Sequence, residues 1–90
     1  MFYLVSYDIP DDKRRTRLAK IMLDFGARVQ YSVFECNMDD KLLDTMLKRV
    51  GKIVSDEDSV RIYALSGKCL ATVKILGRGK LTEDENVYIV

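Results

Sequence analysis

The first eight residues, MFYLVSYD, constrain the fold most, because apolar side chains occupy both faces of the strand that they predict. Successive side chains of a strand point to opposite faces. Tyr3 and Val5 lie on one face, and Phe2 and Leu4 lie on the other. A strand with this pattern is buried on both sides, so the fold has to supply a cover for each face of its sheet.

Two amphipathic segments farther along the chain predict helices. In the first, apolar residues recur at i, i+3, i+4 and i+7, which is the spacing of one helix face, and Gly26 is a suitable end. The second segment has a similar apolar face and is closed by Gly51. Either of two adjacent aspartates can cap each helix, namely Asp11 or Asp12 for the first and Asp39 or Asp40 for the second.

The runs between and after these helices have the composition of strands. Residues 28–38 form a β-rich run with a bend near Tyr31, and residues 60–65 alternate as the residues of a strand do. After a tight turn, residues 69–76 predict another strand, and residues 86–90 predict a short terminal one.

This order of elements, β-α-β-β-α-β with an extra C-terminal strand, predicts an α+β domain of the ferredoxin-like type. Because 90 residues make one domain, we expect residues 1–90 to form it, with residues 78–90 as an extension that pairs with the partner chain. Right-handed crossovers put both helices on one face of the sheet. The other face then needs a cover, which a two-fold homodimer packed sheet to sheet supplies.

The composition excludes some chemistry and indicates a compartment. The chain has no histidine, which rules out imidazole as a base, an acid or a metal ligand. Cys36 and Cys69 lie in apolar runs without a C-x-x-C spacing, so we interpret them as buried free thiols. The N-terminal stretch lacks a basic region and is too short to span a bilayer. We therefore expect a cytoplasmic protein without a membrane partner.

Asp8 ends the first strand, just before Pro10 interrupts the strand pattern. Hard cations such as Mg²⁺ take oxygen ligands and often only one or two protein carboxylates. A dimer would bring two copies of this carboxylate together if its axis passes near this strand end. The alternative is structural, with Asp8 capping a turn or pairing with Arg14.

A basic segment follows, although the formal net charge of the chain is only +1. Cations at the start of a helix oppose its macrodipole, so helix stability does not explain them. One interpretation is contact with the phosphates of a nucleic acid, since guanidinium groups match phosphate oxygens, and the other is a solvated face. The six cations between residues 13 and 28 are Lys13, Arg14, Arg15, Arg17, Lys20 and Arg28.

Aromatic residues near these charges have two common uses. They can stack on nucleobases, or they can fill the core or an interface, which is the commoner use. We interpret Tyr7, Tyr31, Phe34 and Tyr63 as core or interface aromatics.

The stretch YDIPDDKRRTRLAKIMLDFGARVQYSVFEC resembles the signature of the CRISPR-associated protein 2 family, the small member of the spacer-acquisition module. The resemblance continues in DSVRIYAL and the terminal strand, so it covers nearly the whole chain. It implies a ferredoxin-like homodimer whose C-terminal strand crosses to the partner's sheet, with Mg²⁺ held near the paired Asp8 side chains across the dimer axis. By motif position it links six residues to catalysis: Tyr7, Asp8, Arg15, Arg17, Arg28 and Phe34.

The resemblance also implies a function. Some members of this family are metal-dependent endonucleases on single-stranded RNA or double-stranded DNA, and others act without cleavage as a bridge between dimers of the spacer-acquisition integrase. Nucleic acid would be bound by the basic helix through Lys13, Arg14, Arg15, Arg17 and Lys20.

Two other functions stay open at this point. In the first, the dimer is a non-catalytic adaptor that binds duplex DNA by its backbone and bridges integrase dimers. In the second, the chain is a toxin-type messenger RNA nuclease or a small RNA-binding domain. The paired aromatics of an RNA-recognition domain are absent from the sequence, which weakens that last interpretation.

Overall fold

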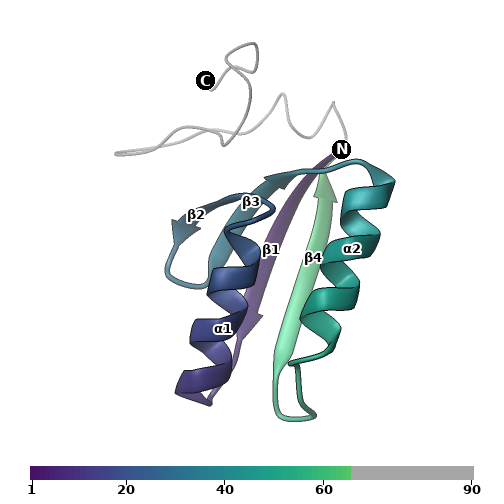
Figure 1. Ribbon diagram of the computed structural model, residues 1–90. Coiled ribbons are helices and arrows are strands. Elements are labelled where there is room, and N and C mark those ends of the chain that lie inside the picture. Colours follow the sequence, from purple (N-terminus) through teal and green to yellow (C-terminus); the bar gives the residue numbers. More distant parts are fainter. Residues whose placement is uncertain (66–90) are drawn as a thin grey trace.

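The computed structural model describes residues 1–65, and the elements in this part follow the predicted order (Figure 1). They are β1 (Phe2–Asp8), α1 (Asp12–Met22), β2 (Ala27–Gln30), β3 (Val33–Asn37), α2 (Asp40–Gly51) and β4 (Ser59–Leu65). The β-α-β-β-α-β order is therefore confirmed. The strands expected at 69–76 and 86–90, and the extension at 78–90, lie outside the described residues.

The four strands form one sheet in the order β2-β3-β1-β4, and all neighbouring strands are antiparallel. The doubly apolar strand β1 takes an inner position, where both of its edges are hydrogen-bonded. The bend expected near Tyr31 is a complete reversal, because residues 31 and 32 form the turn between β2 and β3. This topology confirms the ferredoxin-like fold.

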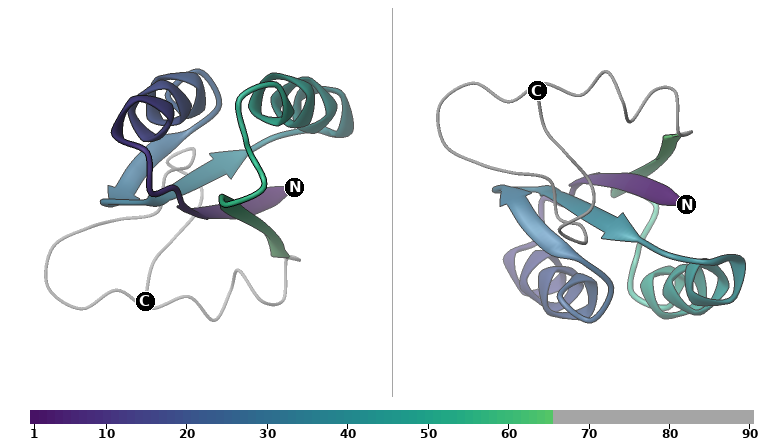
Figure 2. Two further views of the ribbon diagram at one scale, coloured as in Figure 1. Left: turned by 90° about the horizontal axis from the view of Figure 1, so that it is seen from below. Right: turned by 90° about the horizontal axis from the view of Figure 1, so that it is seen from above.

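Both helices cover the same face of the sheet, as the crossover rule predicts (Figure 2). Between them and the sheet lies a core to which β1 contributes Tyr3, Val5 and Tyr7. The largest completely buried side chains of the described part are Phe34, Leu18, Met22, Met38, Met46, Val5 and Cys36. Burial raises the pKa of the Cys36 thiol to about 11, with a smaller effect from Glu35, so the expected buried free thiol is confirmed at this cysteine. Cys69 lies outside the described residues.

Each helix begins at the first of its two candidate caps. Asp11 accepts a hydrogen bond from the backbone N–H of Arg14 at 2.8 Å, and Asp39 accepts one from that of Leu42, also at 2.8 Å. Helix α1 ends at Met22, earlier than the prediction that Gly26 ends it.

Gly26 has a different role, which is to let the chain pass close to β3. A Cβ atom at this position would lie 2.1 Å from the carbonyl oxygen of Glu35 and 2.5 Å from the Cys36 sulfur. The glycine is therefore required by packing between the end of α1 and the sheet.

The opposite face of the sheet carries no helix in the described part of the chain (Figure 2). On this face of β1, Phe2 is buried, Leu4 is half-buried and Asp8 is exposed. We call it the open face. The sheet-to-sheet dimer that would cover it stays a prediction, because the structure holds one chain. No helix within residues 1–65 is long and apolar enough to cross a membrane.

Candidate metal and nucleic-acid site

Asp8 lies at the end of β1 on the open face of the sheet, beside a hollow of about 350 Å³. Strand β4 supplies the other wall, because Asp8 is paired with Ser59 and Ser6 is paired with Arg61. Side chains two residues apart on a strand share a face, so Asp8, Ser6 and Arg61 are directed to the same side. The hollow therefore combines a carboxylate, the hydroxyls of Ser6 and Ser59, a guanidinium and the side chain of Tyr63.

Within the described part of the chain, Asp8 neither caps a turn nor pairs with Arg14, which were its structural alternatives. The Asp8 carboxylate makes no hydrogen bond or ion pair within residues 1–65, and Arg14 binds other carboxylates. An exposed carboxylate without a protein partner is available to a cation or to a substrate.

The donor atoms around Asp8 fit a hard cation only if further ligands come from elsewhere. Within residues 1–65, no three side chains of the His, Cys, Asp and Glu types converge on a point that could hold a metal ion. One carboxylate with the hydroxyls of Ser6 and Ser59 is an oxygen-only set, which suits Mg²⁺ with water, a second chain or a phosphate as remaining ligands. The same set does not suit zinc, whose sites use sulfur and nitrogen ligands.

Arg14 holds the loop between α2 and β4 against the start of α1. Its Nε and Nη2 donate to the two carboxylate oxygens of Asp58 at 3.0 and 3.1 Å, and Nη2 also donates to Glu57 at 2.5 Å. The Asp58 carboxylate is fully covered and accepts a further bond from the backbone N–H of Ser55 at 2.9 Å. The hydrogen bond from Arg14 lowers the pKa of Asp58, and in return the pKa of Arg14 is raised. Most of the N–H donors of Arg14 are thus occupied by contacts within the fold and are not available to a phosphate.

Arg15 is bound to the chain just after Asp8. Its Nη1 donates to the carbonyl oxygen of Ile9 at 2.9 Å, and its other terminal nitrogen forms an ion pair with Asp12. The Asp12 hydrogen bond is the main cause of the raised pKa of Arg15. This guanidinium fixes the backbone where β1 ends.

The other three cations of the basic helix are exposed and form no ion pair within residues 1–65. At 100° per residue, Arg17 lies on the opposite flank of α1 from Arg15, about 200° around the helix axis. Lys13, Arg17 and Lys20 are therefore the cations of this helix that can reach a phosphate without breaking a contact of the fold.

Tyr7, Phe34 and Arg28 form a stack on the helix-covered face. The two rings are buried, with centroids 6.2 Å apart and planes at 27°. Arg28 lies 5.7 Å from the Phe34 centroid and donates to the Tyr7 hydroxyl at 3.4 Å. Tyr7 and Phe34 are core residues as expected. Tyr31 and Tyr63 are 73% and 47% exposed, so they are not core residues of one chain, and an interface role for them stays a prediction.

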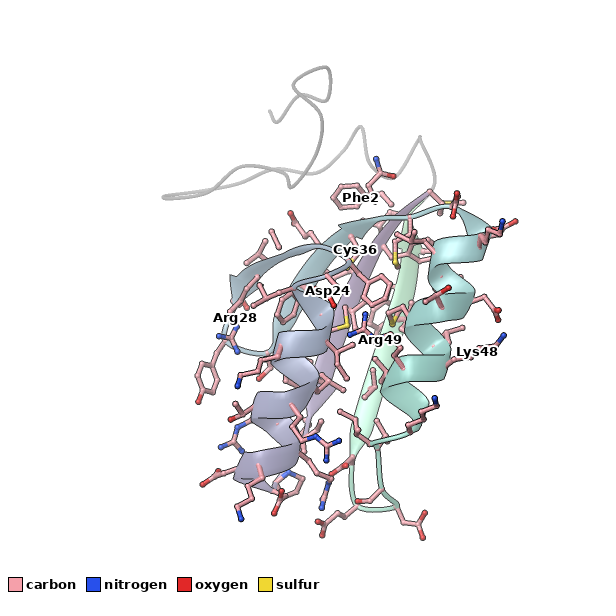
Figure 3. All side chains as sticks on the ribbon, viewed as in Figure 1. Phe2, Asp24, Arg28, Cys36, Lys48 and Arg49 are labelled. Atoms are coloured by element: carbon pink, nitrogen blue, oxygen red, sulfur yellow. The ribbon has the colours of Figure 1, made fainter. Side chains whose placement is uncertain are left out.

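The six residues linked to catalysis by motif position are consequently not gathered in one place. Asp8 is on the open face, whereas Tyr7, Phe34 and Arg28 are on the other. Figure 3 shows Arg28 on the β2 side, apart from the Asp24–Arg49 ion pair of 2.9 Å that joins the turn after α1 to α2. Contacts of Arg15 with Ile9 connect the basic helix to the Asp8 end of β1.

Sequence reasoning missed Arg61 as a neighbour of Asp8. Its place on β4 was visible from the alternation of residues 60–65, but the register between β1 and β4 decides whether it faces Asp8. That register depends on contacts between segments more than 50 residues apart.

Comparison with known proteins gives a consistent result. A family model described as "CRISPR associated protein Cas2" matches residues 1–73. The chain is 46% identical to "CRISPR-associated endoribonuclease Cas2 3" of Synechocystis sp., over 98% of this chain and 97% of that protein. It is 42% identical to "CRISPR-associated endonuclease Cas2 2" of Thermus thermophilus, over 98% of this chain and 94% of that protein. The crystal structure of Streptococcus pyogenes Cas2 is 35% identical and superposes with a TM-score of 0.74, covering 86% of this chain and 100% of that one.

Proposed function

The chain belongs to the Cas2 family of CRISPR-associated proteins, and from this premise we propose that it is a metal-dependent endonuclease whose site is the Asp8 hollow. Its relatives are named as an endoribonuclease and an endonuclease, so cleavage of a phosphodiester bond is the shared chemistry. The observation that supports the site most is Asp8 itself, an exposed carboxylate with no partner in residues 1–65 and with Arg61 lining the same hollow.

Asp8 of each chain in a homodimer would hold one Mg²⁺ across the dimer axis. Such an ion supplies an activated water and neutralises charge on a phosphate. Arg61 binds a non-bridging oxygen of the scissile phosphate by charge-assisted hydrogen bonds, and this interaction strengthens as negative charge develops there.

The residues on the helix-covered face act by positioning Asp8. Tyr7 precedes it and is anchored in the core against Phe34 and Arg28. Ile9 follows it and is held by Arg15 through its carbonyl oxygen. Because both neighbours of Asp8 are fixed, its carboxylate is presented from a rigid strand end, as a precise metal site requires.

The homodimer is part of this proposal because residues 1–65 of one chain offer too few metal ligands. The open face also exposes apolar surface, including the ring of Tyr63. A two-fold partner packed on this face would cover it and place two Asp8 side chains near the axis.

We propose nucleic acid and the spacer-acquisition integrase as the partners. Lys13, Arg17 and Lys20 are exposed and unpaired within the described part, and a dimer doubles their number. Contacts from such side chains to the phosphate backbone position a duplex without reading its sequence. These same groups support the adaptor function, in which the dimer binds duplex DNA and bridges integrase dimers without cutting.

Cleavage of labelled single-stranded RNA and duplex DNA, with Mg²⁺ and with a chelator, separates the two functions. We expect Asp8→Asn to lower Mg²⁺-dependent cleavage by about 100-fold or more, since it removes the one carboxylate that residues 1–65 of each chain contribute to the hollow. Binding of nucleic acid should persist in this variant and weaken in Arg17→Ala. In Arg17→Ala, the plot of log binding constant against log salt concentration should have a slope shallower by about 0.9 per lost phosphate contact.

Asp56→Asn is the matched control, because it removes an exposed carboxylate from the loop between α2 and β4. It should cleave like the native protein. Cleavage that is equally strong in Asp8→Asn would contradict the nuclease site and favour the adaptor.

A further inference from the structure

A second hollow, of about 290 Å³, lies on the other side of the molecule, between α1 and the turn that joins β2 to β3. We call it the Tyr31 groove. Three cations line it, Arg15 and Lys20 from α1 and Arg28 from β2, together with the apolar side chain of Leu23 and the ring of Tyr31. No carboxylate is among its lining residues, although Asp12 contacts Arg15 from outside the groove.

The ring of Tyr31 is held in place and yet uncovered. Arg28 lies 5.6 Å from its centroid and is itself fixed by Phe34 and by the Tyr7 hydroxyl. The turn is tied to β1, since the backbone N–H of Tyr7 donates to the carbonyl oxygen of Ser32 at 3.1 Å. With 73% of Tyr31 exposed, most of the ring surface is left for a ligand.

The charges of the groove suit an anion beside that ring. Lys20 is exposed and has no ion-pair partner within residues 1–65. The pKa of Arg15 is raised first by Asp12 and, to a smaller extent, by Tyr31, so this guanidinium lies near the tyrosine as well. An aromatic face with two or three cations around it is the combination that binds a base and its phosphate.

We propose that the Tyr31 groove binds one unpaired nucleotide of a single-stranded end. The base stacks on Tyr31 against Leu23, and the phosphate is bound by Lys20, with the positive charge of Arg15 beside it in the groove. A paired base inside a duplex has both faces stacked on its neighbours and cannot use the ring. The volume is close to the lower end of small-ligand sites, about 300 Å³, which is enough for one nucleotide.

This inference rests on the proposed function in one respect, because it takes the ligand to be nucleic acid. The groove and the proposed cleavage site lie in different places. Asp8 is on the open face and the groove is on the helix-covered side, so the groove binds the strand away from the point of cleavage. Arg15 is the residue common to both regions, since it lines the groove and holds Ile9 next to Asp8.

Fluorescence anisotropy at one salt concentration tests the proposal with a blunt duplex and the same duplex carrying a four-nucleotide overhang, in both polarities. The native protein should bind at least one overhang duplex about fivefold more tightly than the blunt one, the low end of the effect of base–aromatic stacking. Tyr31→Ala should remove this preference and leave the affinity for the blunt duplex unchanged. Tyr31→Phe, which keeps the ring, should retain the preference.

Three outcomes overturn the proposal. Equal binding of blunt and overhang duplexes by the native protein refutes the groove but leaves the proposed function intact. Equal weakening of both ligands by Tyr31→Ala means that Tyr31 supports the backbone surface and not an unpaired base. No binding of any duplex by the native protein refutes the duplex-binding part of the proposed function together with the groove. Melting curves should show that both variants are folded, because the Tyr31 side chain is so exposed.

Discussion

Tyr7 and Asp8 are neighbours in the chain, but they belong to opposite faces of the sheet and to different environments. Tyr7 is 4% exposed and packs on Phe34 in the core, whereas Asp8 is exposed and has no partner in the described part. Strand alternation makes this possible, because it directs one side chain into the helix-covered face and the next one out. The core thereby provides the rigidity, and the open face provides the reactive group.

This division means that stability and chemistry should respond to different substitutions. Residues that fix the strand end lie on one face, and the carboxylate and the guanidinium of the hollow lie on the other. Variants chosen from each face can confirm or break the separation.

The largest difference in the free energy of unfolding is expected between Phe34→Ala and Asp8→Asn. Phe34 is completely buried, and removing its ring should lower the free energy of unfolding by about 3–5 kcal/mol. Asp8→Asn should change that free energy by less than about 0.5 kcal/mol, because the side chain is exposed and has no partner within residues 1–65. Urea denaturation monitored by circular dichroism measures both. A loss of stability in Asp8→Asn that approached the loss in Phe34→Ala would show that the carboxylate is structural.

A smaller effect on stability is expected from the Arg14–Asp58 contact, which joins the loop between α2 and β4 to α1. This effect should depend on pH. Arg14 lowers the pKa of Asp58, so the ion pair stabilises the fold above the pKa of an unfolded aspartate, about 4, and is lost as the pH falls through the lower folded value. Asp58→Asn removes this contribution. Its melting temperature should be below that of the native protein at pH 7, and the two should converge as the pH falls below about 4.

Asp56→Asn is the control for this comparison, because its exposed carboxylate lies in the same loop. Its melting temperature should follow the native curve at every pH. A difference between native protein and Asp58→Asn that stayed constant down to pH 3 would show that the ion pair is not the cause.

Much of the fold could be predicted from the sequence because its signals are local. The alternation of β1, the apolar stripe of α1 and the capping aspartates each lie within a few residues, and the order of elements follows from them. Gly26 was misinterpreted as a helix end because its real constraint, the approach to Glu35 and Cys36, comes from another strand.

The site was less predictable because a sequence shows charges but not their partners. Arg14 looked like any other cation of the basic helix, and its partner Asp58 is 44 residues away. Tyr31 could be a core or an interface aromatic from its sequence, since nothing in its neighbourhood in the chain shows that the turn leaves it 73% exposed and so outside the core. Partners and exposure of this kind are decided by tertiary packing.

Titration of Mn²⁺, used in place of Mg²⁺, into the native protein and into Asp8→Asn tests the central claim most directly. Calorimetry gives the number of ions bound, without any need for cleavage. If Asp8 from two chains holds one ion across a dimer axis, the native protein binds one ion per two chains, Asp8→Asn binds none at this site, and Asp56→Asn behaves like the native protein. Unchanged binding by Asp8→Asn, or one ion per chain in the native protein, would contradict a metal site shared between the paired Asp8 carboxylates.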